Sequence, residues 1–301
     1  MYAICGASGN TGKVVVEKLL ARGERIRVIG RDTSRLARLV EQGAEAFAAD
    51  LTDPAGLARA FEGARAVYAL VPPNISSADV RGYQERVTDA LAAALDKTSV
   101  PHVVALSSVG ADKADKTGPV VGLHNLEHKL NGLASLNAVY LRAGYFMENL
   151  LPQVAVIQNF GMVAGPLRAD LRVAMIATRD IGEAAADLLL RLDFAGKQSR
   201  ELLGQRDLTY SEVTSVIGKA IARPNLAYAQ LPARQLKPAL VQMGMSSNMV
   251  DLLLEMTEAL NSGHMAALEP RSGRNTTPTS IDTFVSEEFV PRFQAKAAAG
   301  A

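Results

Sequence analysis

Three glycines spaced three residues apart near the start of the chain constrain its fold more than any other feature. Gly6, Gly9 and Gly12 follow an apolar run at residues 2–5 and precede a stretch, residues 13–20, with apolar positions on one helical face. Small residues let the backbone turn sharply between a strand and a helix. The N–H groups of such a turn and the positive end of the helix suit a diphosphate. The pattern therefore predicts a strand–turn–helix unit that binds a dinucleotide.

The rest of the first half alternates short apolar runs with amphipathic stretches of helical period. This alternation is typical of a parallel sheet that is covered by helices on both faces. We therefore expect an α/β protein with a Rossmann-type, doubly wound parallel sheet. The predicted strands are residues 2–5, 25–29, 45–49, 66–71, 102–107 and 138–141.

After about residue 144 the rhythm changes, and longer helical patterns replace the alternation. We predict helices at 146–157, 178–192 and 210–222, a return to the sheet at 201–203, and a smaller, mainly helical C-terminal cap. The predicted division is a dinucleotide-binding domain at 1–155, a segment at 178–222 that packs back onto it, and a substrate cap at 156–177 and 223–301.

Composition excludes several classes of protein. The 301 residues carry a formal net charge of +1, and the basic residues are scattered, so we expect no nucleic-acid partner. The apolar stretches are interrupted by charges and proline, so we expect no membrane span. Cys5 is the one cysteine, which leaves no disulfide framework and fits a reducing compartment; we expect a cytoplasmic protein.

The end of the second predicted strand indicates which dinucleotide is bound. An NAD-binding protein carries an acidic residue there for the ribose hydroxyls, whereas this chain has Gly30, Arg31 and then Asp32. A guanidinium at this place suits a 2′-phosphate, and Arg35 lies one helical turn further on. The sequence thus favours NADP(H). The alternative is that Asp32 takes the ribose and Arg31 is only a solvated strand end.

With this turn and this arginine in place, the chain resembles the NmrA-like group of atypical short-chain dehydrogenase/reductases, which includes NADPH-dependent quinone and triphenylmethane reductases. The likeness covers about the first 190 residues. Within them it includes residues 48–53, 71–73, 105–108 and 141–149. It implies a sheet order of 3-2-1-4-5-6, with the ligand cleft at the carboxyl ends of the strands.

The resemblance also implies roles for individual residues. It places Asp50 near the adenine, residues 71–73 along the ribose and nicotinamide, and Ser107 at the mouth of the fifth strand. The expected cofactor-binding residues are Gly6, Ser8, Gly9, Asn10, Thr11, Gly12, Arg31, Arg35, Asp50, Leu51, Val71, Pro72, Pro73, Ser107, Lys129 and Tyr145. The expected catalytic residues are Ser107, His124, His128 and Lys129.

One departure from the wider superfamily bears on the chemistry. Its standard members pair a tyrosine with a lysine four residues later, and the lysine lowers the pKa of the phenol that delivers a proton to a carbonyl. Here Lys129 is preceded at that spacing by Asn125. Lys129 keeps a role in holding the cofactor in this interpretation, but ordinary ketone reduction is not expected.

A second motif lies on the same predicted helix. His124, Glu127 and His128 form a His-x-x-Glu-His string, in which two histidines four residues apart can bind zinc and the glutamate can act as a base. A catalytic zinc needs a third protein ligand, and the remaining histidines, His102 and His264, are badly placed for it. We therefore predict no metal, and retain His124 and His128 as candidate proton donors.

Two hypotheses about function follow. The first is an enzyme that passes hydride from NADPH to a flat, aromatic or quinone-like small molecule held under the cap, where orientation matters most. The second is a binding module that senses the NADP(H) redox state and acts through a regulatory protein partner. A sugar-nucleotide epimerase is a weaker third hypothesis, because the tyrosine is missing. The sequence leaves a homodimer open.

Overall fold

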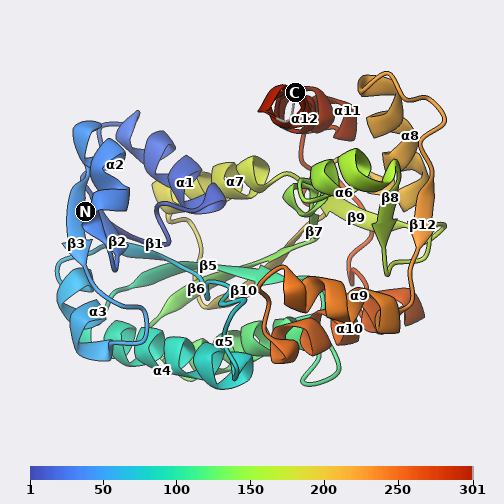
Figure 1. Cartoon of the computed structure of the whole chain (residues 1–301). Coiled ribbons are helices and arrows are strands. Elements are labelled where there is room, and N and C mark those ends of the chain that lie inside the picture. Colours follow the sequence, from blue (N-terminus) through green and yellow to red (C-terminus); the bar gives the residue numbers. More distant parts are fainter. Residues whose placement is uncertain (300–301) are drawn as a thin grey trace.

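Seven parallel strands form the main sheet of the computed structural model, which describes residues 1–299 (Figure 1). The strand order is β10-β6-β5-β4-β1-β2-β3. Strands β1 and β4 are buried throughout, as expected for a parallel sheet covered on both faces. The strands are β1 (Tyr2–Cys5), β2 (Ile26–Gly30), β3 (Glu45–Ala48), β4 (Ala66–Ala69), β5 (His102–Ser108), β6 (Asn137–Ala143) and β10 (Lys197–Leu202).

Two layers of helices cover this sheet (Figure 1). Helices α1 (Asn10–Leu20), α2 (Ala37–Glu41) and α7 (Thr178–Arg191) pack on one face, and the short helix η1 (Thr33–Leu36) precedes α2. Helices α3 (Pro54–Phe61), α4 (Val80–Thr98) and α5 (Val121–Asn131) pack on the other, with η2 (Gly118–Val120) leading into α5.

Helix α7 lies against α1 in spite of the 160 or so residues that separate them in the sequence. A Cβ atom at Gly182 of α7 would lie 2.6 Å from the Cβ atom of Val14 on α1, so only glycine allows this approach. The segment that follows α7 then adds β10 beside β6. The chain thus leaves the main sheet after β6 and returns to it with α7 and β10.

The remaining elements are what we call the cap, and most of them share an apolar core that is separate from those of the main sheet. It contains two small sheets, of order β11-β9-β7 and β12-β8. The cap strands are β7 (Tyr145–Phe146), β8 (Val163–Gly165), β9 (Val173–Ile176), β11 (Asp207–Leu208) and β12 (Tyr228–Gln230). Its helices are η3 (Met147–Leu150), α6 (Gln153–Phe160), α8 (Tyr210–Ala220), α9 (Ala233–Gln242), α10 (Ser247–Ser262), α11 (Ile281–Phe284), the π-helical η4 (Val285–Phe289) and α12 (Val290–Ala299).

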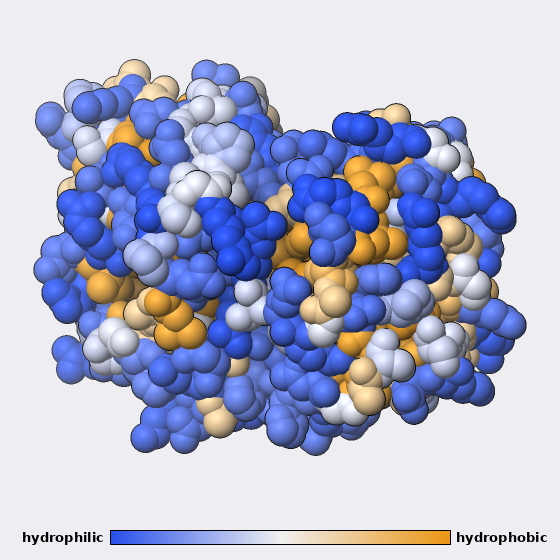
Figure 2. Space-filling model, turned by 180° about the vertical axis from the view of Figure 1, so that it is seen from behind, coloured by the Kyte–Doolittle hydropathy of each residue, from blue (hydrophilic) through white to orange (hydrophobic). Residues whose placement is uncertain are grey.

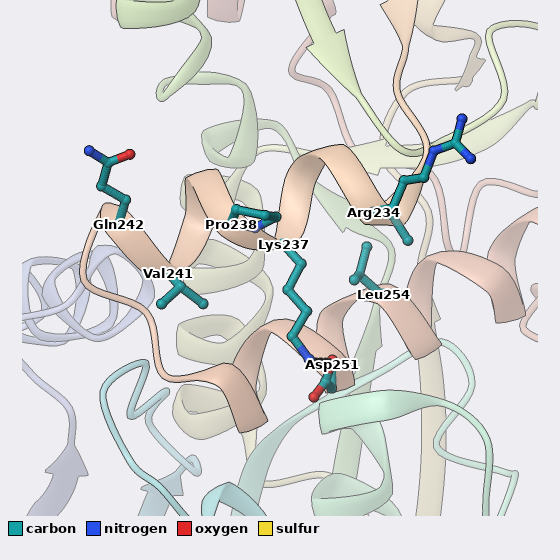
Figure 3. A pocket seen from close by; sticks show the side chains of 8 residues that line it. Arg234, Lys237, Pro238, Val241, Gln242, Asp251 and Leu254 are labelled. Carbon is teal, nitrogen blue, oxygen red and sulfur yellow. Dashed lines mark hydrogen bonds and ion pairs between the residues drawn. The ribbon is translucent and has the colours of Figure 1, made fainter.

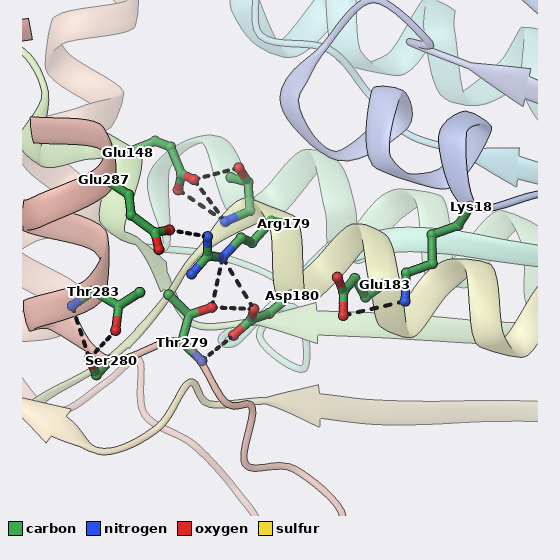
Figure 4. Close-up of polar contacts among 10 residues, drawn as sticks. Lys18, Glu148, Arg179, Asp180, Glu183, Thr279, Ser280, Thr283 and Glu287 are labelled. Carbon is green, nitrogen blue, oxygen red and sulfur yellow. Dashed lines mark hydrogen bonds and ion pairs between the residues drawn. The ribbon is translucent and has the colours of Figure 1, made fainter. Parts of the chain in front are cut away.

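A polar cluster joins the C-terminal helices of the cap to the N-terminus of α7 (Figure 4). The buried Asp180 carboxylate accepts hydrogen bonds from the Thr279 N–H at 3.0 Å and the Thr279 hydroxyl at 2.5 Å. Arg179 reaches from the same turn to Glu287 at 2.5 Å. Because charge-assisted hydrogen bonds of this kind are the stronger ones, this cluster holds the end of the chain on the sheet domain.

From behind, the surface is mostly hydrophilic and is hollowed at the top between two lobes (Figure 2). The lobe on the left of that view corresponds to the cap and the lobe on the right to the sheet domain. None of the helices within residues 1–299 has both the length and the apolar character needed to span a membrane.

The predicted fold class and strand order are confirmed, and β10 adds a seventh strand at the edge next to β6. The helix predicted at residues 146–157 is wrong in its first half. There the chain makes the short strand β7, which pairs in parallel with β9, and the separate helix η3 before α6 begins at Gln153. The division into domains stays a prediction, and the last two residues of its cap, 300–301, lie outside the described part.

Candidate functional site

The glycine turn lies at the carboxyl end of β1. Gly6 has a φ of +63°, and its carbonyl oxygen accepts a hydrogen bond from the Gly9 N–H at 2.9 Å. A Cβ atom at Gly12 would lie 2.3 Å from that same oxygen, so a side chain would force the turn and helix apart. Helix α1 begins directly after Gly9, and no side chain caps its N-terminus. The positive end of α1 is therefore open to an anion.

The predicted diphosphate-binding residues in this turn separate into two groups. Ser8, Gly9 and Asn10 are exposed, so a ligand above the turn can reach them. The side chain of Thr11 instead points into the protein, where its hydroxyl oxygen accepts a hydrogen bond from the buried Tyr68 phenol at 2.9 Å. This contact attaches α1 to β4, so the Thr11 side chain stabilises the turn from below.

At the end of β2, the acidic and basic residues have different surroundings. The Asp32 carboxylate accepts hydrogen bonds from the Ser34 N–H at 2.9 Å and the Ser34 hydroxyl at 2.6 Å, and so caps η1. These bonds lower the pKa of Asp32. Arg31 and Arg35 are exposed, and neither makes an ion pair or a side-chain hydrogen bond with the described residues. The carboxylate is thus engaged locally, while two guanidinium groups remain available to an anion.

The end of β3 adds a second acid to this corner of the sheet. The Asp50 carboxylate accepts hydrogen bonds from the Thr52 N–H at 2.9 Å and the Thr52 hydroxyl at 2.8 Å, which fixes the turn that leads toward α3. Burial raises the pKa of the phenol of Tyr83, which lies on α4. Tyr83 is close enough to Arg31 and Asp50 for both charges to act on this pKa. Sequence reasoning missed Tyr83, because only the packing of α4 brings it to the ends of β2 and β3.

The segment after β4 passes directly beside the glycine turn. A Cβ atom at Gly6 would lie 2.8 Å from a methyl carbon of Leu70. The next residues, Val71 and Pro72, are half-buried, and Pro73 is exposed. The predicted ribose and nicotinamide segment therefore borders the predicted diphosphate site at the same edge of the sheet.

The cap is bonded to the continuation of this segment. The Ser246 N–H, just before α10, donates to the carbonyl oxygen of Ile75 at 2.8 Å. The Asn248 side chain accepts a hydrogen bond from the Val80 N–H, at the start of α4, at 2.9 Å. These two bonds therefore attach the cap to the segment between β4 and α4.

Ser107, an expected catalytic and cofactor-binding residue at the mouth of β5, is part of a buried hydrogen-bond network with Glu127 and Arg142. It is 2% exposed, and its hydroxyl donates to Glu127 of α5 at 2.6 Å. The same carboxylate accepts two hydrogen bonds from Arg142 of β6, at 3.0 and 2.6 Å. These bonds raise the pKa of Arg142. The Ser107 hydroxyl group thus donates its proton in a hydrogen bond to Glu127, beneath the carboxyl edge of the sheet.

The other three candidates on α5 do not converge on one point. Lys129 forms ion pairs with Asp89 and Glu85 of α4, so its ammonium group is directed along the outer helix layer. The His124 ring donates to the backbone carbonyl of Ala111 at 2.9 Å, and His128 is exposed. No group of three potential metal-ligating side chains occurs within the described residues.

Tyr145, a predicted cofactor contact, begins the cap directly beyond β6. Its phenol oxygen accepts a hydrogen bond from the Tyr210 phenol at 3.0 Å, and the ring of Tyr228 lies 4.9 Å from that of Tyr210. Burial raises the pKa of Tyr145, and the residue as a whole is half-buried.

A groove of about 710 Å³ crosses the cap between α9 and α10 (Figure 3). Lys237 of α9 spans it to reach Asp251 of α10 at 2.6 Å. All of its lining residues come from these two helices, and none is a predicted site residue. The groove is therefore separate from the glycine turn and the strand ends.

With this geometry in view, comparison with known proteins identifies the family. A sequence profile of the NmrA-like family matches residues 2–288. The chain belongs to the NmrA-like family. A curated relative, the NAD(P)H azoreductase of Xenophilus azovorans, is 26% identical over 258 residues, which cover 85% of this chain and 86% of the relative.

Two solved structures share the fold over nearly the whole chain. The NADPH-dependent quinone oxidoreductase QOR2 of Escherichia coli, complexed with NADPH, has a TM-score of 0.75 at 20% identity and covers 100% of both chains. The triphenylmethane reductase of Citrobacter sp., complexed with NADP(H), has a TM-score of 0.79 at 16% identity and covers 94% of this chain and 98% of its own. At these identities the likeness establishes the fold alone.

Proposed function

We propose that the protein is an NADP(H)-dependent reductase that transfers hydride to a conjugated small molecule, such as a quinone or an azo compound. The observation that carries the proposal is the arrangement at the end of β2. One carboxylate oxygen of Asp32, Oδ1, caps η1, and Arg31 is exposed at the position that faces the ribose in dinucleotide-binding folds. This arrangement suits a 2′-phosphate and disfavours a ribose that needs an acidic partner.

Each part of the cofactor edge has a task in this proposal. The uncapped N-terminus of α1 binds the diphosphate, while Arg31, with Arg35 nearby, binds the 2′-phosphate. The segment after β4, residues 71–73, lies alongside the ribose and nicotinamide. The reduced nicotinamide supplies the hydride, and the protein holds the acceptor against it and excludes water.

The acceptor class is proposed from two observations. No phenol stands on α5 at the Asn125 position, and Lys129 is engaged with α4, so the usual acid for a simple carbonyl is missing there. A conjugated acceptor spreads the arriving charge over its own bonds and depends less on a strong acid. The relationship to a protein named as an azoreductase supports the same class.

The cofactor part is tested by titrating the protein with NADPH and NADH. We expect tighter binding of NADPH, and we expect Arg31→Ala to weaken NADPH by about tenfold or more, the worth of a charge-assisted contact, while NADH changes little. The matched control is Arg22→Ala, which removes the same charge at the opposite end of α1. Tighter binding of NADH, or an equal effect of both substitutions, would refute the assignment.

A further inference from the structure

The predicted catalytic residues leave the acceptor without a proton donor. The Ser107 hydroxyl donates to Glu127, and the ammonium group of Lys129 is paired with acids on α4. The His124 ring donates to a backbone carbonyl, and His128 lies on the exposed face of α5. The reduced acceptor still has to gain a proton, so another group at this edge of the sheet must supply it or water must.

Tyr145 has the position and the hydrogen bonding that such a donor needs. It lies two residues beyond the end of β6, beside the strand that carries Ser107. The backbone there is fixed, because a Cβ atom at Gly144 would lie 2.5 Å from the carbonyl oxygen of Ala174. Tyr145 is therefore held at the boundary between the sheet domain and the cap.

The direction of one hydrogen bond decides where the Tyr145 proton is available. The buried Tyr210 phenol donates to the Tyr145 oxygen at 3.0 Å, so Tyr145 acts as the acceptor in this pair. Its own O–H is then left for a third group. Tyr145 as a whole residue is half-buried at this boundary.

We propose that Tyr145 is the proton donor to the acceptor, with Tyr210 stabilising the phenolate that remains. The inference rests on the proposed reductase function and goes beyond it, because it replaces the expected cofactor contact of Tyr145 by a catalytic one. The side chain of Asn149 lies close enough to favour the ionised form of Tyr145 as well. The Tyr210 phenol thus donates to the oxygen that gains negative charge, and Asn149 adds to the same effect.

The step balances as follows. The acceptor gains two electrons and one hydrogen as hydride from NADPH, which becomes NADP⁺, and an oxygen or nitrogen of the acceptor then carries a negative charge. The Tyr145 O–H bond breaks and the proton passes to this atom, so the acceptor leaves in its neutral, reduced form. The Tyr145 phenolate regains a proton from water, and one proton is consumed overall.

The electrostatics of the pair agree with this role. Burial raises the pKa of Tyr145 above its usual value of 10.0, while the hydrogen bond from Tyr210 and the nearby Asn149 side chain act in the opposite sense. The phenol therefore carries its proton at neutral pH, as an acid must before it reacts. Its partners limit the cost of losing that proton.

The first test compares acceptors of graded basicity. In Tyr145→Phe we expect kcat/KM to fall by about 100-fold for acceptors whose reduced anions are the most basic, a typical contribution of a general acid, and to fall less as basicity declines. The solvent isotope effect should disappear together with the donor. Tyr228→Phe is the matched control, since its phenol donates to the Leu167 carbonyl inside the cap.

The second test needs no turnover and uses para-nitrophenol, whose absorbance reports its ionisation. A hydrogen bond from Tyr145 should favour the bound phenolate in the complex with NADP⁺, and Tyr145→Phe should weaken phenolate binding by about tenfold or more. Binding of the neutral phenol and of NADPH should change by less than about twofold. Tyr228→Phe should leave all of these affinities as in the unchanged protein.

Three outcomes would overturn the inference. If kcat/KM of Tyr145→Phe falls equally for all acceptors and NADPH binds more weakly, Tyr145 is a cofactor contact and not the proton donor. If the kinetics of Tyr145→Phe are unchanged, water supplies the proton. If the unchanged protein reduces no acceptor, the proposed function fails as well, whereas loss of activity in the variant alone leaves that function intact.

Discussion

Replacing Glu127 by glutamine should cost about 3–5 kcal/mol of the free energy of unfolding, because it leaves the largely enclosed Arg142 without its counter-charge. The estimate follows from the geometry. Glu127 accepts three hydrogen bonds from Arg142 and Ser107, and the side chains of the ion pair are 7% and 13% exposed. Such a loss is a large fraction of the total stability of an ordinary protein.

The adjacent ion pair on the same helix provides the control. Lys129 pairs with Asp89 at the surface, where the carboxylate side chain is 58% exposed, so Asp89→Asn should cost less than about 1 kcal/mol. A double variant, Glu127→Gln with Arg142→Met, should recover most of the loss, because no uncompensated charge remains.

Urea unfolding followed by circular dichroism measures all four proteins under one condition. We expect Glu127→Gln to shift the midpoint far below that of the unchanged protein, and Asp89→Asn to remain close to it. If the two single variants lose equal stability, or if the double variant is worse than Glu127→Gln, the account of the network is wrong.

Three further predictions concern the turn, the buried thiol and metal ions. Gly12→Ala should abolish measurable NADPH binding in a titration, because its Cβ would lie 2.3 Å from the Gly6 oxygen; retained affinity would show that the turn does not hold the cofactor. Burial raises the pKa of Cys5 to about 12, so about one thiol in 10⁴ is ionised at pH 8, and iodoacetamide should react only after unfolding. Fast alkylation of the folded protein would contradict the burial of this thiol. Since the unfolded thiol ionises near pH 9 and the folded one near 12, Cys5 should lower the free energy of unfolding as the pH rises between those values. Prolonged chelation of metal ions should leave NADPH binding and activity unchanged. If chelation removes zinc and activity together, a zinc site at His124 and His128 would be supported instead.

The sheet could be predicted because its signals are local. Each strand is a short apolar run, each helix has a period, and the glycines mark the first turn, so the fold class follows from the sequence pattern. The strand order was implied by the resemblance to the NmrA-like family. The first half of residues 146–157 was mispredicted because its structure depends on a distant partner. Tyr145 pairs with Met175 of β9, and the sequence around residue 145 contains no local pattern that indicates this pairing.

The candidate site was predicted less completely, since a helical pattern does not specify how the helix is rotated against its neighbours. The sequence placed Glu127 and Lys129 together on α5, but the first faces Arg142 of the sheet and the second faces α4. The contacts of Tyr145 with Tyr210, and of Tyr83 with the ends of β2 and β3, join residues far apart in the chain. Such contacts are set by packing.

The most direct test of the central claim is the rate at which the protein, saturated with NADPH, reduces two panels of acceptors. Loss of the nicotinamide absorbance gives kcat/KM for quinones and azo compounds on one side and for simple ketones and aldehydes on the other. We expect the conjugated panel to be reduced and the simple carbonyls to react at least about 100-fold more slowly, because a simple carbonyl cannot spread the arriving charge over conjugated bonds. Efficient reduction of ketones would contradict the mechanism, and tight NADPH binding without oxidation by either panel would show a binding protein in place of a reductase.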